Sequence, residues 1–313
     1  MTRVAVIGGG QNCEHSVSLA SAASVASGLA ADHDVVRLRI GTDGSWRSDG
    51  RVLGLAAAVE VLRGCDVAFP VLHGPRAEDG TVAALCELAG VAYVGSGVRA
   101  GALAMDKWAT KLVAEALGIA TAPGVLLTSR TAAAYGWNGP VVVKPVAAGS
   151  SHGVTLVGTP DGLGRALAEA LALDDRVLVE DVVVGREIDV AVLGRPDGSR
   201  VVAPTLEIVT DGLFDFATKY DGSADFRIPA RLEEAETKAL ESAAVAMYDA
   251  LGCAGVARID FFWTGSGPVL NEVNTMPGFT EQSQVPKMFA AVGTSYADLL
   301  ALLVGDALAS PAP

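Results

Sequence analysis

The part of the chain that most restricts its fold is residues 255–278, which read GVARIDFFWTGSGPVLNEVNTMPG. Two apolar runs flank the turn sequence TGSG at 264–267, and this pattern predicts a β-hairpin. Alternate residues of a strand point to the same face of a sheet. If the two strands pair, one face of the hairpin gathers Asp260, Glu272 and Asn274.

Three oxygen donors beside Arg258 suit a hard cation such as Mg²⁺, which usually sits on substrate phosphates rather than in an all-protein cage. The alternative is a hairpin edge that carries solvated polar residues. A carboxylate in an otherwise apolar strand normally needs a partner, which favours the metal interpretation.

The composition is that of a globular protein with two or three domains, with 313 residues of which 50% are hydrophobic and 19% charged. A net charge of −13 argues against non-specific nucleic-acid binding. The four cysteines are scattered without a C-x-x-C pair, so we expect free thiols. The apolar start is too short for a signal peptide, and no apolar stretch reaches about 18 residues. We therefore expect a cytoplasmic protein that does not enter the membrane.

Strands and helices alternate along the first third of the chain, which predicts an open parallel sheet of βαβ units. Ligands of such sheets bind beyond the carboxyl ends of the strands, where the loops at 8–18 and 73–81 lie. Glu14 precedes the first helix, and its carboxylate either complements the helix dipole or holds an ammonium group. The local sequence leaves both interpretations open. The predicted strands are 3–7, 34–40, 66–72 and 91–94, and the predicted helices are 16–29 and 80–89.

A second region begins near residue 95 with a long predicted helix over 97–117. A β-branched strand then delivers Lys144 to a loop of small residues at 147–153, and a second strand leaves it, which predicts a hairpin lid. Backbone N–H groups of such a loop can approach phosphate oxygens, and a lysine adds a point charge. The alternative is an ordinary hairpin with a permissive loop. Further strands are predicted over 125–128, 176–183, 188–193 and 201–209, and helices over 231–251, 284–292 and 295–308.

Seven motifs in one order resemble the D-alanine–D-alanine ligase family of the ATP-grasp superfamily. They span almost the whole chain, which makes chance similarity improbable. The motifs are EHSVSLASA (14–22), LHGPRAEDGT (72–81), GSGVRAGALAMDK (95–107), VVVKPVAAGSSHG (141–153), KY (219–220), GVARIDFF (255–262) and NEVNTMPGFT (271–280).

The resemblance implies an α/β fold, α+β overall, in which an N-terminal open parallel βαβ sheet precedes an ATP-grasp fold made of two α+β subdomains. We expect an N-terminal domain at residues 1–95, a central lid subdomain at 96–185 and a C-terminal catalytic subdomain at 186–313. By the same analogy we expect a homodimer.

The resemblance also implies an activity, the ATP-dependent joining of two D-alanines through an acyl phosphate for peptidoglycan precursor synthesis. The implied small molecules are ATP, D-alanine or a related amino acid, and two Mg²⁺ ions, for which Mn²⁺ can substitute. At the nucleotide end, the resemblance assigns Lys107, Lys144 and Lys219 to the phosphates, Ser151, Glu180, Val183 and Glu187 to the rest of the nucleotide, and Asp260, Glu272 and Asn274 to the metal ions.

At the amino-acid end, the implied roles are to hold two amino acids and to stabilise the charge that develops between them. A single oxyanion donor is commonly worth about 10²–10³ in rate. The resemblance assigns Glu14, linked to Ser150 and Tyr220, to the first ammonium group, His73 to the first substrate, Arg258 and the Gly278 backbone to the oxyanion, and Ser283 to the second carboxylate.

Several positions depart from the family pattern. Arg76 and Ala77 replace a glycine-bearing pair, and Asp181-Val182-Val183 stands where a lysine is usual. Changes of this kind can reshape a pocket without altering the fold. A ligase of the same family for other amino acids therefore stays open. A catalytically silent nucleotide-binding regulator is the other alternative, which the surviving lysines and metal-binding residues disfavour.

Overall fold

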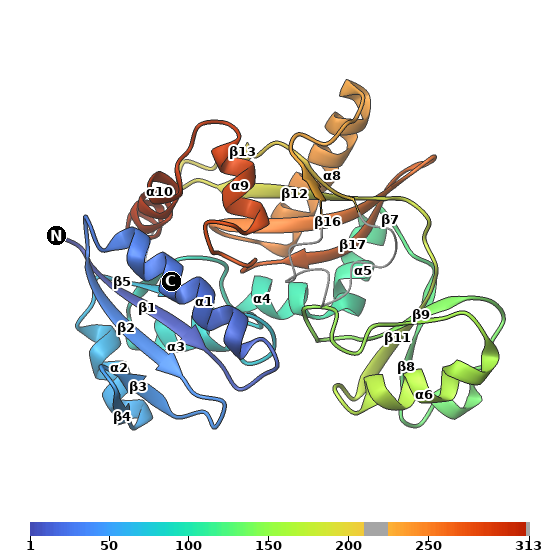
Figure 1. Cartoon of the computed structure of the whole chain (residues 1–313), viewed down its shortest axis with the longest axis horizontal. Coiled ribbons are helices and arrows are strands. Elements are labelled where there is room, and N and C mark those ends of the chain that lie inside the picture. The colour runs from blue at the N-terminus through green and yellow to red at the C-terminus, as the bar shows by residue number, and fades with distance from the viewer. Residues whose placement is uncertain (210–224, 311–313) are drawn as a thin grey trace.

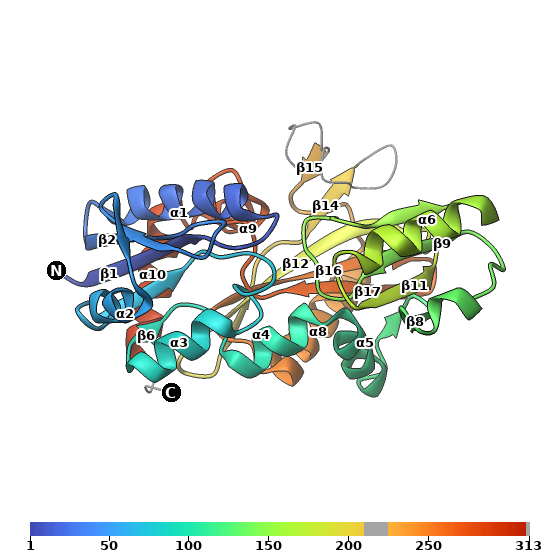
Figure 2. The same cartoon turned by 90° about the horizontal axis from the view of Figure 1, so that it is seen from below.

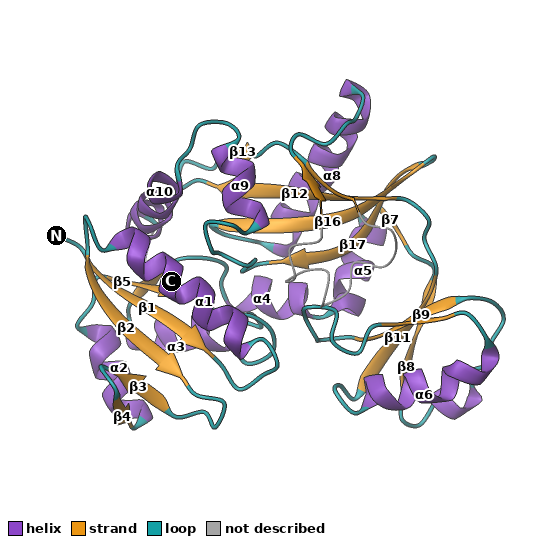
Figure 3. Ribbon diagram, in the orientation of Figure 1, coloured by secondary structure: helices purple, strands orange, loops and turns teal. Residues whose placement is uncertain are grey.

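The chain folds into three β-sheets with helices packed against their faces (Figure 1). The computed structural model describes residues 1–209 and 225–310. A six-stranded sheet lies at the N-terminal end of the molecule, a four-stranded sheet at the far end, and a seven-stranded sheet between them (Figures 1 and 3). This arrangement confirms the predicted mixed α/β fold class. None of the helices within the two described ranges is long and apolar enough to cross a membrane.

The six-stranded sheet contains the predicted βαβ units. Four of its strands are parallel, and two short strands that were not predicted extend one edge in antiparallel fashion. In spatial order the strands are β4 (Arg51–Leu53), β3 (Trp46–Ser48), β2 (Asp34–Ile40), β1 (Arg3–Gly9), β5 (Val67–Pro70) and β6 (Ala92–Tyr93).

Helices cover both faces of this sheet, as a parallel sheet requires. Val4 and Val6 of β1 face one apolar core, and Ala5 and Ile7 face the other. The first core is closed by the C-terminal helix, so the two ends of the chain pack together, as Figure 2 shows for α1 and α10. The helices are α1 (His15–Leu29) and α10 (Tyr296–Ala309) on one face, and α2 (Leu55–Arg63) and α3 (Thr81–Ala89) on the other.

The four-stranded antiparallel sheet carries the predicted hairpin lid. Its strands β9 and β10 pair around the loop at 146–154, and one helix covers its buried face. In spatial order the strands are β10 (Thr155–Val157), β9 (Val141–Pro145), β11 (Arg176–Asp181) and β8 (Gly124–Thr128), the covering helix is α6 (Pro160–Leu171), and a short 3₁₀ turn, η1, spans Ala132–Ala134.

The seven-stranded sheet is antiparallel except for its parallel edge strand β7. Three helices pack against one face of it, and the other face is turned toward the four-stranded sheet (Figure 1). The strands are β15 (Asp225–Arg227), β14 (Leu206–Val209), β12 (Arg186–Gly194), β16 (Val256–Thr264), β17 (Gly267–Asn274) and β7 (Ala120–Thr121), with β13 (Arg200–Val202) on β12, and the helices are α4 (Val98–Met105), α5 (Lys107–Ala116) and α8 (Glu234–Leu251).

The predicted hairpin is formed by β16 and β17. Asp260 lies opposite Glu272, and Arg258 lies opposite Asn274, so the register brings the predicted oxygen donors to one end of the hairpin. A register shift between Asp260 and Phe261 was not predicted. A shift of this kind bends a strand and re-aims the side chains beside it.

Two predicted elements are wrong in detail. The single helix over 97–117 is broken at Asp106, whose extended backbone (ψ 96°) ends α4 and whose side chain accepts a hydrogen bond from the Ala109 N–H to cap α5. The single strand over 201–209 is two strands, β13 and β14. The domain boundaries at 95 and 185 stay predictions. Helix α9 (Gln284–Ala290) follows the hairpin and packs against α10.

Candidate active site

A cavity of about 450 Å³ lies between the four-stranded and seven-stranded sheets. It is open to solvent, and both charged groups and apolar side chains line it. Eight predicted nucleotide and metal residues line it, together with Arg258 from β16, namely Lys107, Lys144, Ser151, Glu180, Val183, Glu187, Asp260 and Glu272.

Apolar side chains form much of the cavity lining. They come mainly from β9, β10, the segment after β11, and the seven-stranded sheet. Pockets for small molecules are commonly apolar with a few placed polar groups, and Glu187 supplies one here. The apolar lining residues include Val142, Leu156, Val182, Val183, Val184, Ile208, Phe262 and Leu270.

Glu180 lies at the centre of a buried group of charges. Its two carboxylate oxygens lie 2.7 Å from Lys111 Nζ and 2.6 Å from Lys144 Nζ. Burial alone would raise the pKa of Glu180, but the two ammonium groups hold that pKa below its ordinary value. One carboxylate for two ammonium groups leaves a local excess of positive charge, which fits an anion such as a phosphate. Lys111 was not predicted.

Lys107 lies at the start of α5, on the other side of the cavity. Its ammonium group donates to the Ala148 carbonyl oxygen at 2.7 Å and lies 3.2 Å from Glu272 Oε2. It therefore joins the glycine-rich loop to the hairpin. Because the helix breaks at Asp106, Lys107 is the first residue of the new helix α5 rather than part of a continuous helix with α4.

Two of the metal residues predicted on the hairpin, Asp260 and Asn274, form hydrogen bonds within the protein. Arg258 donates to both oxygens of Asp260 at 2.7 Å, and Asn274 Nδ2 donates to Asp260 Oδ2 at 3.0 Å. Although burial disfavours the charge of a guanidinium, the nearby Asp260 and Asp189 raise the pKa of Arg258. Accordingly, the described residues contain no group of three or more His, Cys, Asp or Glu side chains that is set to hold a metal. The donors are nevertheless hard oxygens, which fit Mg²⁺ once Asp260 exchanges its partners.

Glu14 forms the opposite end of the site. It is buried, with 6% of its surface exposed, and its Oε1 accepts a hydrogen bond of 2.5 Å from the Ser150 hydroxyl. Its Oε2 is buried and has no hydrogen-bond partner among the described residues. A buried carboxylate oxygen without a partner is costly, so it is suited to a ligand that carries an ammonium group.

The glycine-rich loop approaches Glu14 very closely. A Cβ atom on Gly149 would lie 2.3 Å from Glu14 Oε2, so a side chain there would displace the Glu14 carboxylate from the position that the structure shows. Ser150 and Ser151 have positive φ angles of 50° and 57°, a conformation that is uncommon for residues with side chains. Backbone strain of this kind is often found where a loop closes on a ligand.

A set of hydrogen bonds joins the N-terminal sheet to the segment after β17. His73 Nδ1 lies 2.9 Å from the Met276 carbonyl oxygen, and Glu78 accepts from the Met276 N–H at 3.0 Å. Desolvation lowers the pKa of His73, and Nδ1 is the donor in this contact because a carbonyl oxygen can only accept. Desolvation also raises the pKa of Glu78, to about 7. Gly278 and Ser283 lie just beyond, and the Thr280 N–H donates to Ser283 Oγ at 3.0 Å.

The structure thus brings the predicted residues together from both ends of the chain. Lys219 and Tyr220 lie outside the described residues. Sequence analysis missed Lys111, Glu78, Asp189 and Gln284. Asp189 gave the same signal as Asp260, a carboxylate within an apolar strand.

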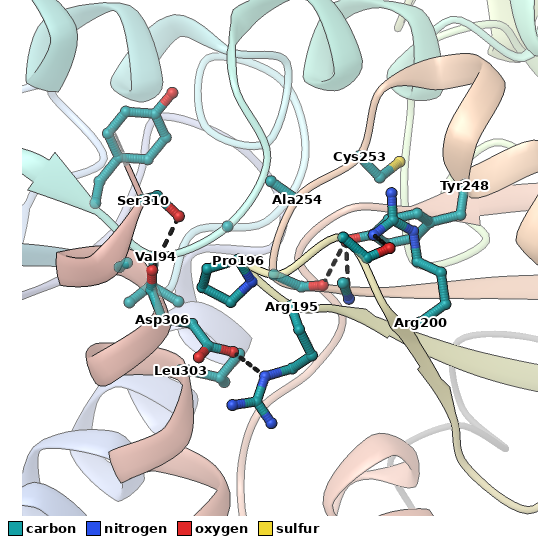
Figure 4. A pocket seen from close by; sticks show the side chains of 16 residues that line it. Val94, Arg195, Pro196, Arg200, Tyr248, Cys253, Ala254, Leu303, Asp306 and Ser310 are labelled. Atoms are coloured by element: carbon teal, nitrogen blue, oxygen red, sulfur yellow. Dashed lines mark hydrogen bonds and ion pairs between the residues drawn. The ribbon is translucent and has the colours of Figure 1, made fainter. Parts of the chain in front are cut away.

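A second cavity, of about 230 Å³, lies away from this site, between β6, the β12–β13 turn, α8 and α10 (Figure 4). Within this cavity, Arg195 Nε lies 2.7 Å from Asp306 Oδ2, which joins the segment after β12 to α10. Arg200 Nε, on β13, donates to Asp249 of α8 at 2.7 Å.

Comparison with family models matches both ends of the chain. Residues 3–96 match the family described as D-ala D-ala ligase N-terminus, and residues 119–305 match D-ala D-ala ligase C-terminus. A D-alanine–D-alanine ligase of Rhodococcus erythropolis is 43% identical over an alignment that covers 98% of this chain and 97% of the relative. A D-alanine–D-alanine ligase of Mycolicibacterium smegmatis is 42% identical, with 98% and 96% covered.

Solved structures show the same likeness. The VanG D-Ala:D-Ser ligase from Enterococcus faecalis superposes with a TM-score of 0.85 at 33% identity, covering 98% of this chain and 99% of that chain. The D-alanine–D-alanine ligase from Coxiella burnetii superposes with a TM-score of 0.81 at 29% identity, covering 98% and 94%.

Proposed function

Since this chain belongs to the D-alanine–D-alanine ligase family, we propose that it joins two D-alanines at the expense of ATP, for peptidoglycan precursor synthesis. It is an ATP-dependent ligase that acts on small molecules, and it uses a divalent metal. The observation that carries the proposal is Glu14, whose buried and unpartnered oxygen meets the glycine-rich loop in a site with the clustered lysines.

The nucleotide occupies the cavity of about 450 Å³. Its base lies against the apolar lining near Val183, its ribose faces Glu187, and its phosphates meet the lysines. Two Mg²⁺ ions, or Mn²⁺ in their place, would supply positive charge to the transferring phosphoryl group when bound, as is general for phosphoryl transfer. The residues that hold the phosphates and nucleotide are Lys107, Lys144, Lys219, Ser151, Glu180, Val183 and Glu187, and those that hold the metal are Asp260, Glu272 and Asn274.

The first D-alanine is held through its ammonium group by Glu14, which the Ser150 hydroxyl orients. Tyr220 completes this link. The carboxylate of the bound amino acid attacks the γ-phosphorus of ATP and forms an acyl phosphate and ADP. A carboxylate is a poor electrophile, and phosphorylation supplies the leaving group that it lacks. His73 supports this subsite by fixing the backbone at Met276.

The second D-alanine is held by its carboxylate at Ser283. Its amine, once neutral, attacks the acyl carbon, the oxyanion that forms is stabilised by Arg258 and the Gly278 N–H, and phosphate leaves with formation of the peptide bond. Donors aimed at a developing oxyanion are worth more in a cavity that excludes water than in solution.

A ligase for a different second amino acid is the other candidate. The observation that favours it is the likeness to a D-Ala:D-Ser ligase at 33% identity. The two are distinguished by incubating the protein with ATP, Mg²⁺ and a panel of D- and L-amino acids and by identifying the dipeptides by mass. D-alanyl-D-alanine as the main product supports the proposal, and a mixed or L-dipeptide as the main product would contradict it.

A phosphate-release assay with the same amino acids tests the silent-regulator alternative, because tight ATP binding without phosphate release on any amino acid would identify a regulator. We further propose a cytoplasmic location. We also propose a homodimer, which light scattering of the purified protein tests.

A further inference from the structure

We propose that Asp189 and Gln284 form a second anchor for Arg258, which keeps the guanidinium in place when Asp260 turns from it to a divalent cation. This inference rests on the proposed function, because it concerns the metal and the oxyanion donor of that same site. Nothing in the sequence comparison assigns a role to either residue.

The first observation is that Arg258 binds both oxygens of Asp260. Its Nε donates to one carboxylate oxygen and its Nη2 to the other, both at 2.7 Å, and Asn274 Nδ2 donates to the second oxygen at 3.0 Å. A guanidinium carries a positive charge and repels a cation that approaches the same carboxylate. A divalent cation at Asp260 therefore competes with Arg258 for these oxygens.

The second observation is that another carboxylate lies beside Arg258. Asp189 of β12 lies directly opposite Asp260 in the sheet register and is 2% exposed. Its Oδ2 lies 3.5 Å from Arg258 Nε, which is within ion-pair distance but longer than a good hydrogen bond. A small shift of the guanidinium toward Asp189 would exchange one carboxylate partner for the other.

The third observation is that Gln284 connects the two groups. Its Oε1 accepts from Arg258 Nη1 at 2.5 Å, and its Nε2 donates to Asp189 Oδ2 at 2.8 Å. The amide therefore presents an acceptor to the guanidinium and a donor to the carboxylate. In the reverse orientation the amide NH₂ would face the guanidinium donors, and the amide oxygen would face the carboxylate oxygen. Gln284 begins α9, one residue after Ser283, so it also links this anchor to the proposed second amino-acid subsite.

The energetic argument is that a buried arginine should not lose its counter-charge. Removing one partner of a buried ion pair is strongly destabilising, because it leaves an uncompensated charge. If Asp260 were the sole anchor, the cation would have to overcome that cost when it bound. With Asp189 and Gln284 in place, Arg258 keeps one carboxylate and one amide partner and stays beside the reacting groups.

The test uses Mn²⁺ as the probe, titrated into the full chain with a saturating non-hydrolysable ATP analogue and followed by the paramagnetic signal of the free ion. For Asp189→Asn we expect a dissociation constant about tenfold higher than that of the unaltered protein, equal to about 1.4 kcal/mol. The kcat should fall by a similar factor with little change in either amino-acid KM, because the oxyanion donor is misplaced. Gln284→Met should change both quantities two- to fivefold, by about 0.4–1 kcal/mol.

Asp197→Asn is the matched control, since Asp197 is an exposed carboxylate that accepts hydrogen bonds from the Ser199 N–H and hydroxyl in the β12–β13 turn. Unchanged Mn²⁺ affinity and kcat in Asp189→Asn would overturn the proposal. If that variant does not fold, Gln284→Met decides, and unchanged Mn²⁺ affinity there overturns it as well. If the unaltered protein makes no dipeptide while Asp189→Asn still weakens Mn²⁺ binding, the proposed function fails and the anchor stands.

Discussion

The two ends of the candidate site differ in how completely their charges are satisfied. At the Glu14 end, a buried carboxylate oxygen has no hydrogen-bond partner among the described residues. At the Asp260 end, Arg258 and Asn274 donate three hydrogen bonds to the carboxylate. The first end has an open position for a cationic group of a ligand, whereas at the second end a cation competes with Arg258 for the carboxylate.

This difference indicates where binding and where catalysis should be sensitive to substitution. At the Glu14 end, removing the carboxylate should weaken binding of the amino acid. At the Asp260 end, removing Arg258 should mainly lower the rate, because its guanidinium is proposed to stabilise the oxyanion during the reaction. Four substitutions test the comparison, from the largest expected effect to the smallest.

Arg258→Ala should lower kcat by about 10²–10³, the usual loss on removing one oxyanion donor, with smaller changes in KM. Steady-state kinetics with D-alanine and ATP measure this. Arg195→Ala is the control, because that arginine is paired with Asp306 at the second cavity. A normal rate in Arg258→Ala would remove the residue from the mechanism.

Glu14→Gln should act on binding at the opposite end. Hydrogen bonds to charged groups contribute about 1.5–3 kcal/mol, so the KM for the first amino acid should rise by about 10- to 100-fold. The KM for ATP should stay the same, because Glu14 does not line the nucleotide cavity. An equal rise in both KM values would indicate a general disruption rather than loss of an ammonium partner.

Gly149→Ala keeps Glu14 but crowds its carboxylate. The added Cβ would lie 2.3 Å from Glu14 Oε2, so either the carboxylate or the glycine-rich loop must leave the position that the structure shows. We expect kcat/KM for the amino acid to fall about tenfold, which is about 1.4 kcal/mol. Gly158→Ala, where a Cβ meets nothing within 4 Å, should behave like the unaltered protein. Equal activity of the two variants would contradict close approach of the loop.

Glu78→Gln should change the pH dependence of stability. Desolvation raises the pKa of Glu78 to about 7, so the folded protein retains a proton that the unfolded chain loses at lower pH. The contribution of Glu78 is therefore intact in acid and is lost as the pH rises from the ordinary pKa of a glutamate toward 7. Because the side chain is partly exposed, we expect a loss of only about 1–2 kcal/mol.

Urea unfolding of the unaltered protein and of Glu78→Gln, each at about pH 5 and about pH 8, measures the difference. The variant should lose less stability than the unaltered protein between the two pH values. Equal losses would show that Glu78 titrates normally.

The elements that were predicted correctly are those in which an apolar strand pattern and a functional side chain occur together. The hairpin with its turn at 264–267 was predicted because two apolar runs flank a glycine-rich turn, and Asp260 was noticed because a carboxylate interrupts one of them. The lid hairpin at β9 and β10 was predicted for the same reason.

Tertiary partners account for what the sequence did not reveal. The break at Asp106 depends on a cap bond to Ala109, and a helical pattern continues across it. Lys111 and Gln284 act through contacts with Glu180 and Asp189, which lie far away in the chain and show no pattern in sequence. Pairings of this kind become visible only when the strands are assembled.

The most direct test of the account follows the oxygen atoms of the first amino acid. D-alanine labelled with ¹⁸O in its carboxylate is incubated with the protein, ATP and Mg²⁺, and the released phosphate is analysed by mass. Activation through an acyl phosphate transfers one labelled oxygen to each phosphate, with one dipeptide formed per phosphate released. Unlabelled phosphate alongside dipeptide would contradict the account, because the carboxyl group would then have been activated by another route.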